Sequence, residues 1–326
     1  MLFSPHDPWV IREKLLHSGL LRRINPFALS EKARVKARWN PPDTAVRHWY
    51  QIPLVISRVN RRVSGDSRAN FHDFVCSRYF NDGKKRRALS LGCGSGDREL
   101  EWARRGVFYQ ILGLDLSPHR IARANSRAAE ENFAASVKFE VNDVNSLNDY
   151  AERFDVVLFE HSLHHFTGVG MILEKVKRLL APGGLLIVDE FVGPRRFQWT
   201  PAQLALADGL LLSIPEQYRR FVGSNRTKNR NLRAGTALMW LNDPSEAVES
   251  DAIAPELERQ YAVLARRNYG GTICQLLFQD IAHHFGVDDG TNFVAANRVL
   301  DAEEDLIARG VISSDYAAFV CSAPES

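Results

Sequence analysis

A glycine-rich segment, Ser90-Leu91-Gly92-Cys93-Gly94-Ser95-Gly96, follows a short apolar run and opens an expected helix. Glycines allow a tight turn and let a ligand lie against bare backbone, and the amino terminus of a helix attracts electronegative groups. Asp115 ends the next apolar run, 19 residues after Gly96. An acid at this place accepts hydrogen bonds from a ribose diol in nucleotide-binding folds. The two features together predict a site for a nucleotide-like ligand.

Histidines and carboxylates gather at the ends of two further apolar runs. Glu160 and His161 end one of them, and Asp189 and Glu190 end the other. Histidine suits the removal of a proton because its pKa lies near operating pH. We expect His161 to act as a general base, with Glu190 or Asp189 as the alternative base or substrate anchor. A packing or capping role for the histidines is an equally good interpretation.

Positioning these residues requires a framework, and residues 88–192 have the pattern of one. Short runs that are apolar on both faces alternate with amphipathic segments, which predicts a parallel sheet covered by helices on both sides. Strands are expected at Ala88–Leu91, Tyr109–Leu114, Val137–Val141, Phe154–Phe159, Leu185–Asp189, Tyr261–Asn268 and Tyr316–Ser322, and helices at Ala45–Arg62, Ala69–Phe80, Asp97–Arg105, Pro118–Asn132, Gly170–Leu180, Thr272–Phe285 and Asn297–Arg309.

The glycine spacing and four later segments resemble a known family. The loop reads Gly-Cys-Gly-Ser-Gly rather than the GxGxxG of dinucleotide sites. The later segments are Asn142–Asp143 and the runs FDVVLF, SLHHF and LLAPGGLLIV, which end at residues 159, 166 and 188. Over about residues 86–192 the chain resembles the class I S-adenosylmethionine-dependent methyltransferases of the small-molecule or sugar type (methyltransferase domain types 11 and 12). Ser90 departs from the family pattern, which usually has an acid there that helps to hold the methionine amino group.

This resemblance implies an α/β, Rossmann-like fold. The family has a seven-stranded, mostly parallel sheet with helices on both faces. For this chain it implies a helical amino-terminal cap at 1–87 and a cofactor-binding methyltransferase domain at 88–326. Insertions that choose the substrate are then expected at about 193–258, after the fifth strand, and at about 270–312, between the sixth and seventh strands.

The resemblance also implies S-adenosyl-L-methionine as the cofactor. Asp115 would contact the ribose, Asp143 would lie near the adenine, and Glu160 would face the methionine moiety. The implied cofactor-binding set is Gly92, Cys93, Gly94, Gly96, Asp115, Leu116, Asp143, Val144 and Glu160.

Aromatic and basic residues outside the framework are candidates for contact with the methyl acceptor. Arginines beside aromatic rings suit an anionic or ring-bearing molecule. The candidates are Trp49, Tyr50, His165, Arg195, Arg196 and Trp199. No metal site is expected, since the pair His283–His284 lacks a third ligand at a fitting spacing.

Composition narrows the class of protein. Four cysteines among 326 residues form no CxxC pair, which argues against a zinc finger or a disulfide framework and favours a reducing compartment, the cytoplasm. The chain begins without the pattern of a secretory signal, and no apolar run approaches the roughly 18 residues of a membrane span. The net charge of +3 hides an asymmetry: residues 1–87 have 18 basic and 7 acidic residues, and the rest have 24 and 32.

These observations favour one function and leave others open. We expect methyl transfer to a hydroxyl, less readily an amine, of a small molecule or saccharide in a biosynthetic pathway. The segment after the fourth strand is not Asn/Asp-Pro-Pro-Tyr, and the core is acidic, so nucleic acid is disfavoured as a partner. The alternatives are an RNA methyltransferase that grips RNA through its basic amino-terminal third, and a catalytically inactive cofactor-binding regulatory subunit. The sequence carries no sign of an oligomeric state.

Overall fold

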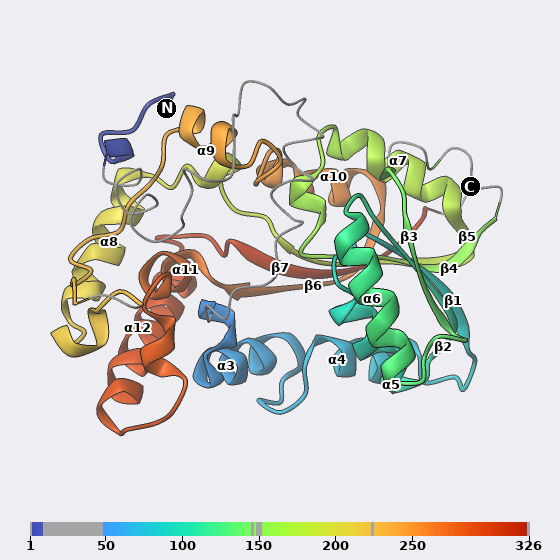
Figure 1. Cartoon of the computed structure of the whole chain (residues 1–326), viewed down its shortest axis with the longest axis horizontal. Coiled ribbons are helices and arrows are strands. Elements are labelled where there is room, and N and C mark those ends of the chain that lie inside the picture. The colour runs from blue at the N-terminus through green and yellow to red at the C-terminus, as the bar shows by residue number, and fades with distance from the viewer. Residues whose placement is uncertain (1, 9–47, 145–146, 148–151, 223–224, 325–326) are drawn as a thin grey trace.

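The computed structural model describes residues 2–8, 48–144, 147, 152–222 and 225–324. The strands of this part span Arg86–Leu91 (β1), Phe108–Asp115 (β2), Val137–Val141 (β3), Phe154–Glu160 (β4), Leu180–Phe191 (β5), Ala262–Gly270 (β6) and Tyr316–Ser322 (β7). They form one seven-stranded sheet in the order β3-β2-β1-β4-β5-β7-β6. Figure 1 shows this sheet running through the molecule with helices on both sides. The expected seven-stranded Rossmann-like architecture is therefore confirmed.

The sheet is parallel except for its last two pairings. β1 pairs in parallel with β2 and β4, β2 with β3, and β4 with β5, while β7 lies antiparallel between β5 and β6. The chain leaves β1 outward through β2 and β3 and then returns to β4 on the other side of β1. At such a reversal the loops after the two central strands diverge and leave a crevice beyond their carboxyl ends. The glycine-rich loop follows β1, and Glu160 and His161 lie at the end of β4.

Helices cover both faces of the sheet (Figure 1). On one face Val55 of α3, Val75 of α4 and Trp102 of α5 belong to one buried cluster; on the other, Leu173 of α7 and Leu257 of α10 belong to a second. The helices span Pro53–Ser64 (α3), Phe71–Tyr79 (α4), Asp97–Arg105 (α5), Pro118–Glu130 (α6), Val169–Leu179 (α7), Pro201–Leu212 (α8), Thr236–Asn242 (α9), Ser250–Gln260 (α10), Thr272–Phe278 (α11) and Thr291–Ala308 (α12), with short 3₁₀ turns at Trp49–Gln51 (η2), Leu163–His165 (η4), Arg195–Phe197 (η5), Glu216–Arg219 (η6) and Ala282–Phe285 (η7).

The helix expected at 45–62 begins later than predicted. Residues 45–47 lie outside the described part, and Trp49–Gln51 form the turn η2 before α3 starts at Pro53. Ile52 is extended, with φ −66° and ψ 122°, because the residue before a proline avoids the helical region. Pro53 then occupies the first helical position, where a missing N–H costs nothing. α3 packs against β6 and α12, so this part of the amino-terminal region covers the sheet.

The helix expected at 272–285 is broken in two. α11 ends at Phe278, and Asp280 adopts a positive φ of 68° before the turn η7. Lys228 explains the break: it is 5% exposed, and its Nζ donates to the carbonyls of Leu276, Leu277 and Gln279 at 2.7, 3.1 and 2.8 Å. These carbonyls would otherwise lack partners at the end of the helix. Lys228, which lies between η6 and α9, therefore terminates α11. The last long helix, α12, begins at Thr291 rather than at the expected Asn297.

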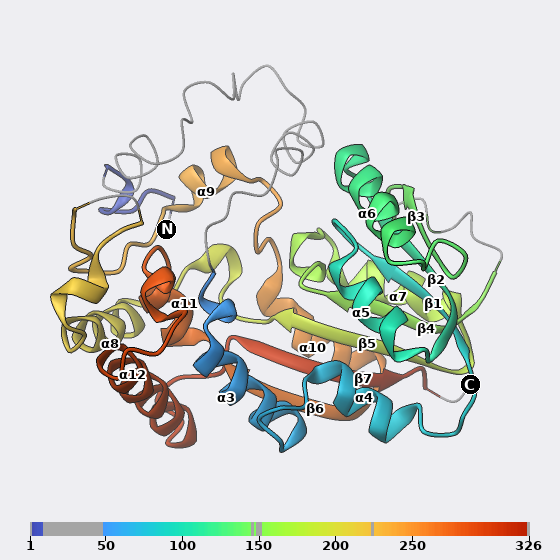
Figure 2. The same cartoon turned by 60° about the horizontal axis from the view of Figure 1, so that its bottom comes forward.

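The additions to the sheet lie together at one end of the molecule. Figures 1 and 2 both show α8, α9, α11 and α12 grouped there, whereas β1 to β3 with α5 and α6 occupy the other end. Within the described residues no helix is both long and apolar enough to cross a membrane.

Candidate functional site

The glycine-rich loop after β1 turns back onto β2 and η4. The backbone N–H groups of its first two residues donate to the carbonyl of Leu114 at 2.8 and 3.0 Å. Gly92 has φ +77°, and a Cβ there would lie 2.6 Å from the Cβ of Ser162; Gly96 has φ +80°, and a Cβ there would lie 2.7 Å from the ring of Phe139. Both positions therefore require glycine, and the loop lies directly against its neighbours at the switch point.

Asp115 ties this loop to the end of β2. One of its carboxylate oxygens accepts from the N–H of Gly94 at 3.0 Å, and the other accepts from the N–H of Ser117 at 2.8 Å. Each oxygen of a carboxylate can accept two hydrogen bonds, so the group keeps capacity for a ligand's hydroxyls. Asp115 and Leu116 are both half-buried. The loop and the acid predicted to share a ligand therefore lie together.

The segment after β3 lies next to Asp115. The N–H of Asn142 donates to the Asp115 carbonyl at 3.0 Å, and the N–H of Asp143 donates to the Asn142 side chain at 2.7 Å. Val144 is 3% exposed. The ends of β1, β2 and β3 thus bring the loop, Asp115 and Asp143 to one edge of the sheet, as the sequence predicts.

A buried acid beneath the loop was not expected from the sequence. Ser90, which stands where related loops have an acid, donates its hydroxyl to Oε1 of Glu99, and the two residues are 3% and 2% exposed. Burial raises the pKa of Glu99 to about 8, and its Oε2 has no hydrogen-bond partner among the described residues. α5 therefore delivers to Ser90 the carboxyl group that the strand lacks. An acid near the start of the helix after the loop is the signal that could have found it.

Glu160 at the end of β4 turns its side chain toward α4 and α5. Its carboxylate contacts Nε2 of His72 at 2.9 Å, accepts from Nε1 of Trp102 at 2.6 Å, and has Nε of Arg98 at 4.0 Å. Burial opposes ionisation, but His72 and Arg98 more than offset it and lower the pKa of Glu160. The side chain is 3% exposed. The structure therefore holds the ionised Glu160 carboxylate among side chains that come from distant segments.

His161 pairs with Asp189 across the ends of β4 and β5. Its Nε2 lies 3.5 Å from Oδ2 of Asp189, and its backbone N–H donates to the Asp189 carbonyl at 2.8 Å. Asp189 also accepts from the hydroxyl of Tyr269 at 2.6 Å. Burial would raise the pKa of this carboxyl, but His161, Arg98 and Tyr269 lower it to about 2. His161 itself is strained, with φ +55°, and its side chain is 32% exposed, so an ionised aspartate holds a partly open imidazole.

Aromatic rings surround the open side of His161. The rings of Tyr50 and Tyr316 have centroids 6.3 and 6.0 Å from the His161 ring. Trp49 is 7% exposed and packs on Tyr316 at 5.2 Å, whereas Tyr50 is 47% exposed. Of the acceptor candidates, Tyr50 thus lies beside His161 and is exposed, whereas Trp49 is buried against Tyr316.

Glu190 lies in the interior and holds η4. It is 0% exposed; one oxygen accepts from the N–H groups of Ser162 and Leu163 at 2.9 and 2.7 Å, and the other accepts from Phe191 N–H at 2.7 Å and faces Nδ1 of His164. Burial works against the charged imidazole, but Glu190 raises the pKa of His164 to about 9. A carboxylate with this many donors cannot approach an acceptor. In the structure Glu190, one of the candidate bases, thus positions η4 and His164.

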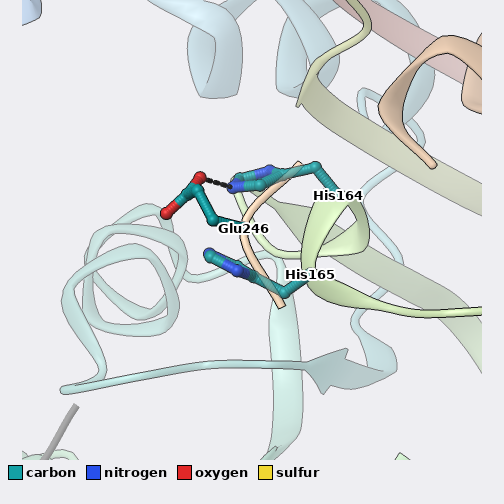
Figure 3. Close-up of side chains that lie close together, drawn as sticks. All are labelled: His164, His165 and Glu246. Atoms are coloured by element: carbon teal, nitrogen blue, oxygen red, sulfur yellow. Dashed lines mark ion pairs between the residues drawn. The ribbon is translucent and has the colours of Figure 1, made fainter. Parts of the chain in front are cut away.

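His165 lies beside His164 and faces the segment between α9 and α10. Its Nδ1 is 3.3 Å from the hydroxyl of Ser245, and Nε2 of His164 is 3.5 Å from Oε1 of Glu246. Figure 3 shows the two imidazole rings and the Glu246 carboxylate directed toward one another. Ser245 and Glu246 did not stand out in the sequence, because nothing in their spacing links them to the histidines.

The remaining acceptor candidates are divided between surface and interior. Arg195 pairs with Asp251 of α10 at 3.0 Å, and Arg196 donates to backbone carbonyls before α10. Trp199 is 4% exposed and donates to Asp315 at 2.7 Å, so its ring packs in the core rather than lining an open site. Arg98, which sequence reasoning overlooked, is 42% exposed, and its Nε lies 4.0 Å from the carboxylate of Glu160, the residue before His161.

Over part of its length the chain is similar to known methyltransferases. Residues 82–231 match the model of a methyltransferase domain. The ubiquinone biosynthesis O-methyltransferase of Rhodopseudomonas palustris (strain BisB18) is 27% identical over 172 residues, which cover 51% of this chain and 61% of that protein. The 27-O-demethylrifamycin SV methyltransferase of Amycolatopsis mediterranei is 32% identical over 106 residues, 32% of this chain and 39% of that protein. The chain thus spans about three fifths or less of these relatives' lengths.

Among solved structures, a SAM-dependent methyltransferase from Thiobacillus denitrificans in complex with S-adenosyl-L-homocysteine is 18% identical. The match covers 86% of this chain and 100% of that one, with a TM-score of 0.41.

Proposed function

The chain carries a class I S-adenosylmethionine-dependent methyltransferase domain, and on that premise we propose that it transfers a methyl group to a hydroxyl of a small molecule. The observation that supports this most is the pair of His161 and Asp189, which stands at the switch point beside the glycine-rich loop. The relatives named above are an O-methyltransferase and a 27-O-demethylrifamycin SV methyltransferase, which favours a hydroxyl over an amine.

The residues around the loop fit S-adenosylmethionine. Asp115 holds the glycine-rich loop through Gly94 and keeps acceptor capacity for ribose hydroxyls. Asp143 and Val144 would lie on the adenine side, and Glu160 near the methionine. When bound, the cofactor supplies a methyl group on a sulfonium, which is a good leaving group.

Glu99 is proposed to replace the acid that Ser90 lacks. Its carboxyl group is hydrogen-bonded to Ser90 beneath the loop, so the acidic character of this place is kept although its source has moved from β1 to α5. The inactive-subunit alternative rested on Ser90, and this pair weakens it. A neutral Glu99 would ionise when an ammonium group approaches, because an opposite charge lowers the pKa of a buried acid.

His161 is proposed to be the general base. A hydroxyl must lose its proton as the methyl group arrives, and a partly exposed imidazole at the carboxyl edge can accept it. Asp189 orients the ring and stabilises the imidazolium that forms, while Tyr269 fixes the Asp189 carboxylate. Tyr50 and Tyr316 would hold a ring-bearing acceptor in place.

The additions to the sheet are proposed to select that acceptor. We retain the division into a cap at 1–87 and a domain at 88–326, of which residues 1 and 9–47 lie outside the described part. An anionic acceptor is supported by Arg98, whose side chain is 42% exposed, more than by Arg195, which is paired with Asp251. A saccharide remains a second acceptor class. The cysteine pattern supports a cytoplasmic location.

Calorimetry and turnover assays test this proposal. The purified protein should bind S-adenosylmethionine and S-adenosylhomocysteine, and it should methylate members of a panel of phenols and hydroxylated metabolites. His161→Ala should lower turnover by about 100-fold or more, because that is what a general base contributes, while the cofactor Kd stays unchanged. His119→Ala, which removes an exposed histidine from α6, is the matched control. Failure to bind either cofactor form would reject the proposal, and full turnover in His161→Ala would remove the base assignment alone.

A further inference from the structure

Two consecutive histidines and one glutamate converge beside the proposed active site. His164 and His165 belong to η4, and Glu246 comes from the segment that links α9 to α10. One possible ligand atom from each lies within 4.8 Å of the other two. Figure 3 shows all three side chains directed at the same space. Sequence spacing predicts no such group, because Glu246 is remote from the histidines along the chain.

Both imidazoles are held in the way that metal-binding histidines are held. A histidine ligand usually gives its second ring nitrogen to a carboxylate or another acceptor, which fixes the tautomer and the ring orientation. Nδ1 of His164 faces the buried carboxylate of Glu190. Nδ1 of His165 faces the Ser245 hydroxyl, which in turn donates to Asp243 at 2.6 Å. In each case Nε2 is therefore the nitrogen that would bind an ion.

The separation between ligand atoms fits a shared ion better than a direct hydrogen bond. Nε2 of His164 is 3.5 Å from Oε1 of Glu246, which is longer than the usual 2.7 to 3.2 Å of an N–H···O bond. Two ligands at about 2.1 Å from a tetrahedral zinc ion are about 3.4 Å apart. The observed gap is thus the edge expected for two ligands of one metal.

A fourth group supports the same interpretation. Asp243 is 1% exposed, and its Oδ2 has no hydrogen-bond partner among the described residues. Its other oxygen, Oδ1, accepts from the Ser245 hydroxyl that faces His165. A buried carboxylate oxygen without a donor is costly unless a cation is near.

We propose that His164, His165 and Glu246 bind one divalent transition-metal ion of borderline hardness, such as Zn²⁺. Two imidazoles and one carboxylate are ligands that such ions prefer. The ion replaces the proton on Nε2 of His164, since a ligating histidine is neutral. Three protein ligands leave at least one position for an oxygen of an outside molecule; that this molecule is the methyl acceptor rests on the proposed function, whereas ion binding does not.

Metal content tests the site directly. Protein purified from zinc-supplemented cells should retain one equivalent of zinc by mass spectrometry after dialysis, and Co²⁺ added to the metal-free protein should give visible d–d absorption. His165→Ala and the isosteric Glu246→Gln should each weaken Zn²⁺ binding by about 100-fold or more, since even outer-shell changes cost 10- to 100-fold.

A second adjacent histidine pair provides the control. The rings of His283 and His284 are 3.9 Å apart, close to the 4.1 Å between His164 and His165. His283→Ala should leave Zn²⁺ affinity unchanged. Circular dichroism on each variant separates loss of a ligand from loss of the fold. Wild-type protein that binds no stoichiometric Zn²⁺ or Co²⁺, or folded His165→Ala and Glu246→Gln proteins with wild-type affinity, would overturn the site. Both results are independent of methyl transfer.

Discussion

Two histidine–carboxylate pairs stand side by side at the carboxyl edge of the sheet and differ in almost every physical respect. Asp189 and Glu190 are consecutive on β5, and each pairs with a histidine that follows β4. Since successive side chains of a strand point to opposite faces, the two carboxylates enter different surroundings. His161 keeps 32% of its side chain exposed, whereas that of His164 keeps 10% beside a fully buried Glu190.

The two pairs suit different roles: the open one suits the proposed proton transfer, and the buried one holds the backbone of η4. Asp189 has two side-chain partners, His161 and the Tyr269 hydroxyl, and its histidine stays accessible to a ligand. The oxygens of Glu190 accept from three backbone N–H groups and also contact His164. Glu190 therefore fixes the shape of η4. Exposure and the number of donors therefore separate a candidate base pair from a positioning pair.

Removal of the Glu190 charge should have the largest effect on the comparison. Glu190→Gln leaves His164 without its ionised partner and turns an acceptor into a donor that faces backbone N–H groups. We expect the free energy of unfolding to fall by about 3–5 kcal/mol, as for a broken buried ion pair. Urea denaturation measures it. A loss below about 1 kcal/mol would mean that the two pairs do not differ in structural importance.

Asp189→Asn should instead act on turnover. The side chain keeps its size but no longer stabilises an imidazolium on His161. We expect kcat to fall by about 10- to 100-fold, less than the loss of the base itself, while KM and the cofactor Kd stay close to wild type. Steady-state kinetics provides the measurement, with the acceptor that the panel of phenols and hydroxylated metabolites identifies. An equal rise in KM would assign Asp189 to acceptor binding rather than to orientation of His161.

Tyr269→Phe tests whether the Asp189 environment is built as described. The change removes one hydrogen bond to a charged group, which costs about 1.5 kcal/mol, and keeps the ring that packs near Tyr316. Thermal unfolding should show this loss together with a smaller fall in kcat than in Asp189→Asn. No change in either quantity would indicate that Tyr269 does not support the pair.

Glu99 sharpens the comparison because it is a buried acid with no histidine. Its pKa of about 8 lies above its ordinary value of 4.5 because of burial, opposite in direction to Asp189 and Glu190. Between pH 4.5 and about 8 Glu99 keeps its proton in the folded state but loses it in the unfolded state. The free energy of unfolding therefore falls as pH rises through this range. The slope from this one group is at most about 1.4 kcal/mol per pH unit.

Glu99→Gln should flatten that dependence between pH 4.5 and 8 in denaturation series of the cofactor-free protein. Glu101→Gln, a change at a partly exposed acid on the same helix, is the control. Parallel slopes in wild type and Glu99→Gln would contradict the buried-acid assignment.

The sheet and the contact between the glycine-rich loop and Asp115 could be predicted because they depend on local patterns. Strands buried on both faces read as continuous apolar runs, and Gly92, Gly96 and Asp115 stand at strand ends where parallel topology must bring them together.

The features that escaped prediction depend on partners far away in the chain. Lys228 ends a helix by binding carbonyls that lie 48 and 49 residues later in the chain, and His72 meets Glu160 at a separation of 88 residues. A sequence shows that Glu160 ends a strand, but not which of many basic residues will fold against it. Trp199 illustrates the reverse error: a large aromatic next to arginines suggests a binding surface, yet its indole finds a buried acceptor in Asp315.

The pairing of β5 with β7 gives the two carboxylates a shared vulnerability. Asp189 lies opposite Ala318 and Glu190 opposite Ala317. A one-residue deletion earlier in β5 that preserved this ladder would move Glu190 into the place of Asp189 and bring Phe191 opposite His164. Because successive side chains of a strand point to opposite faces, even the smallest register shift, one residue, moves each side chain to the other face. The surroundings of the two histidines therefore depend on the register of β5, and a shift of one residue would leave a carboxylate beside His161 but none beside His164.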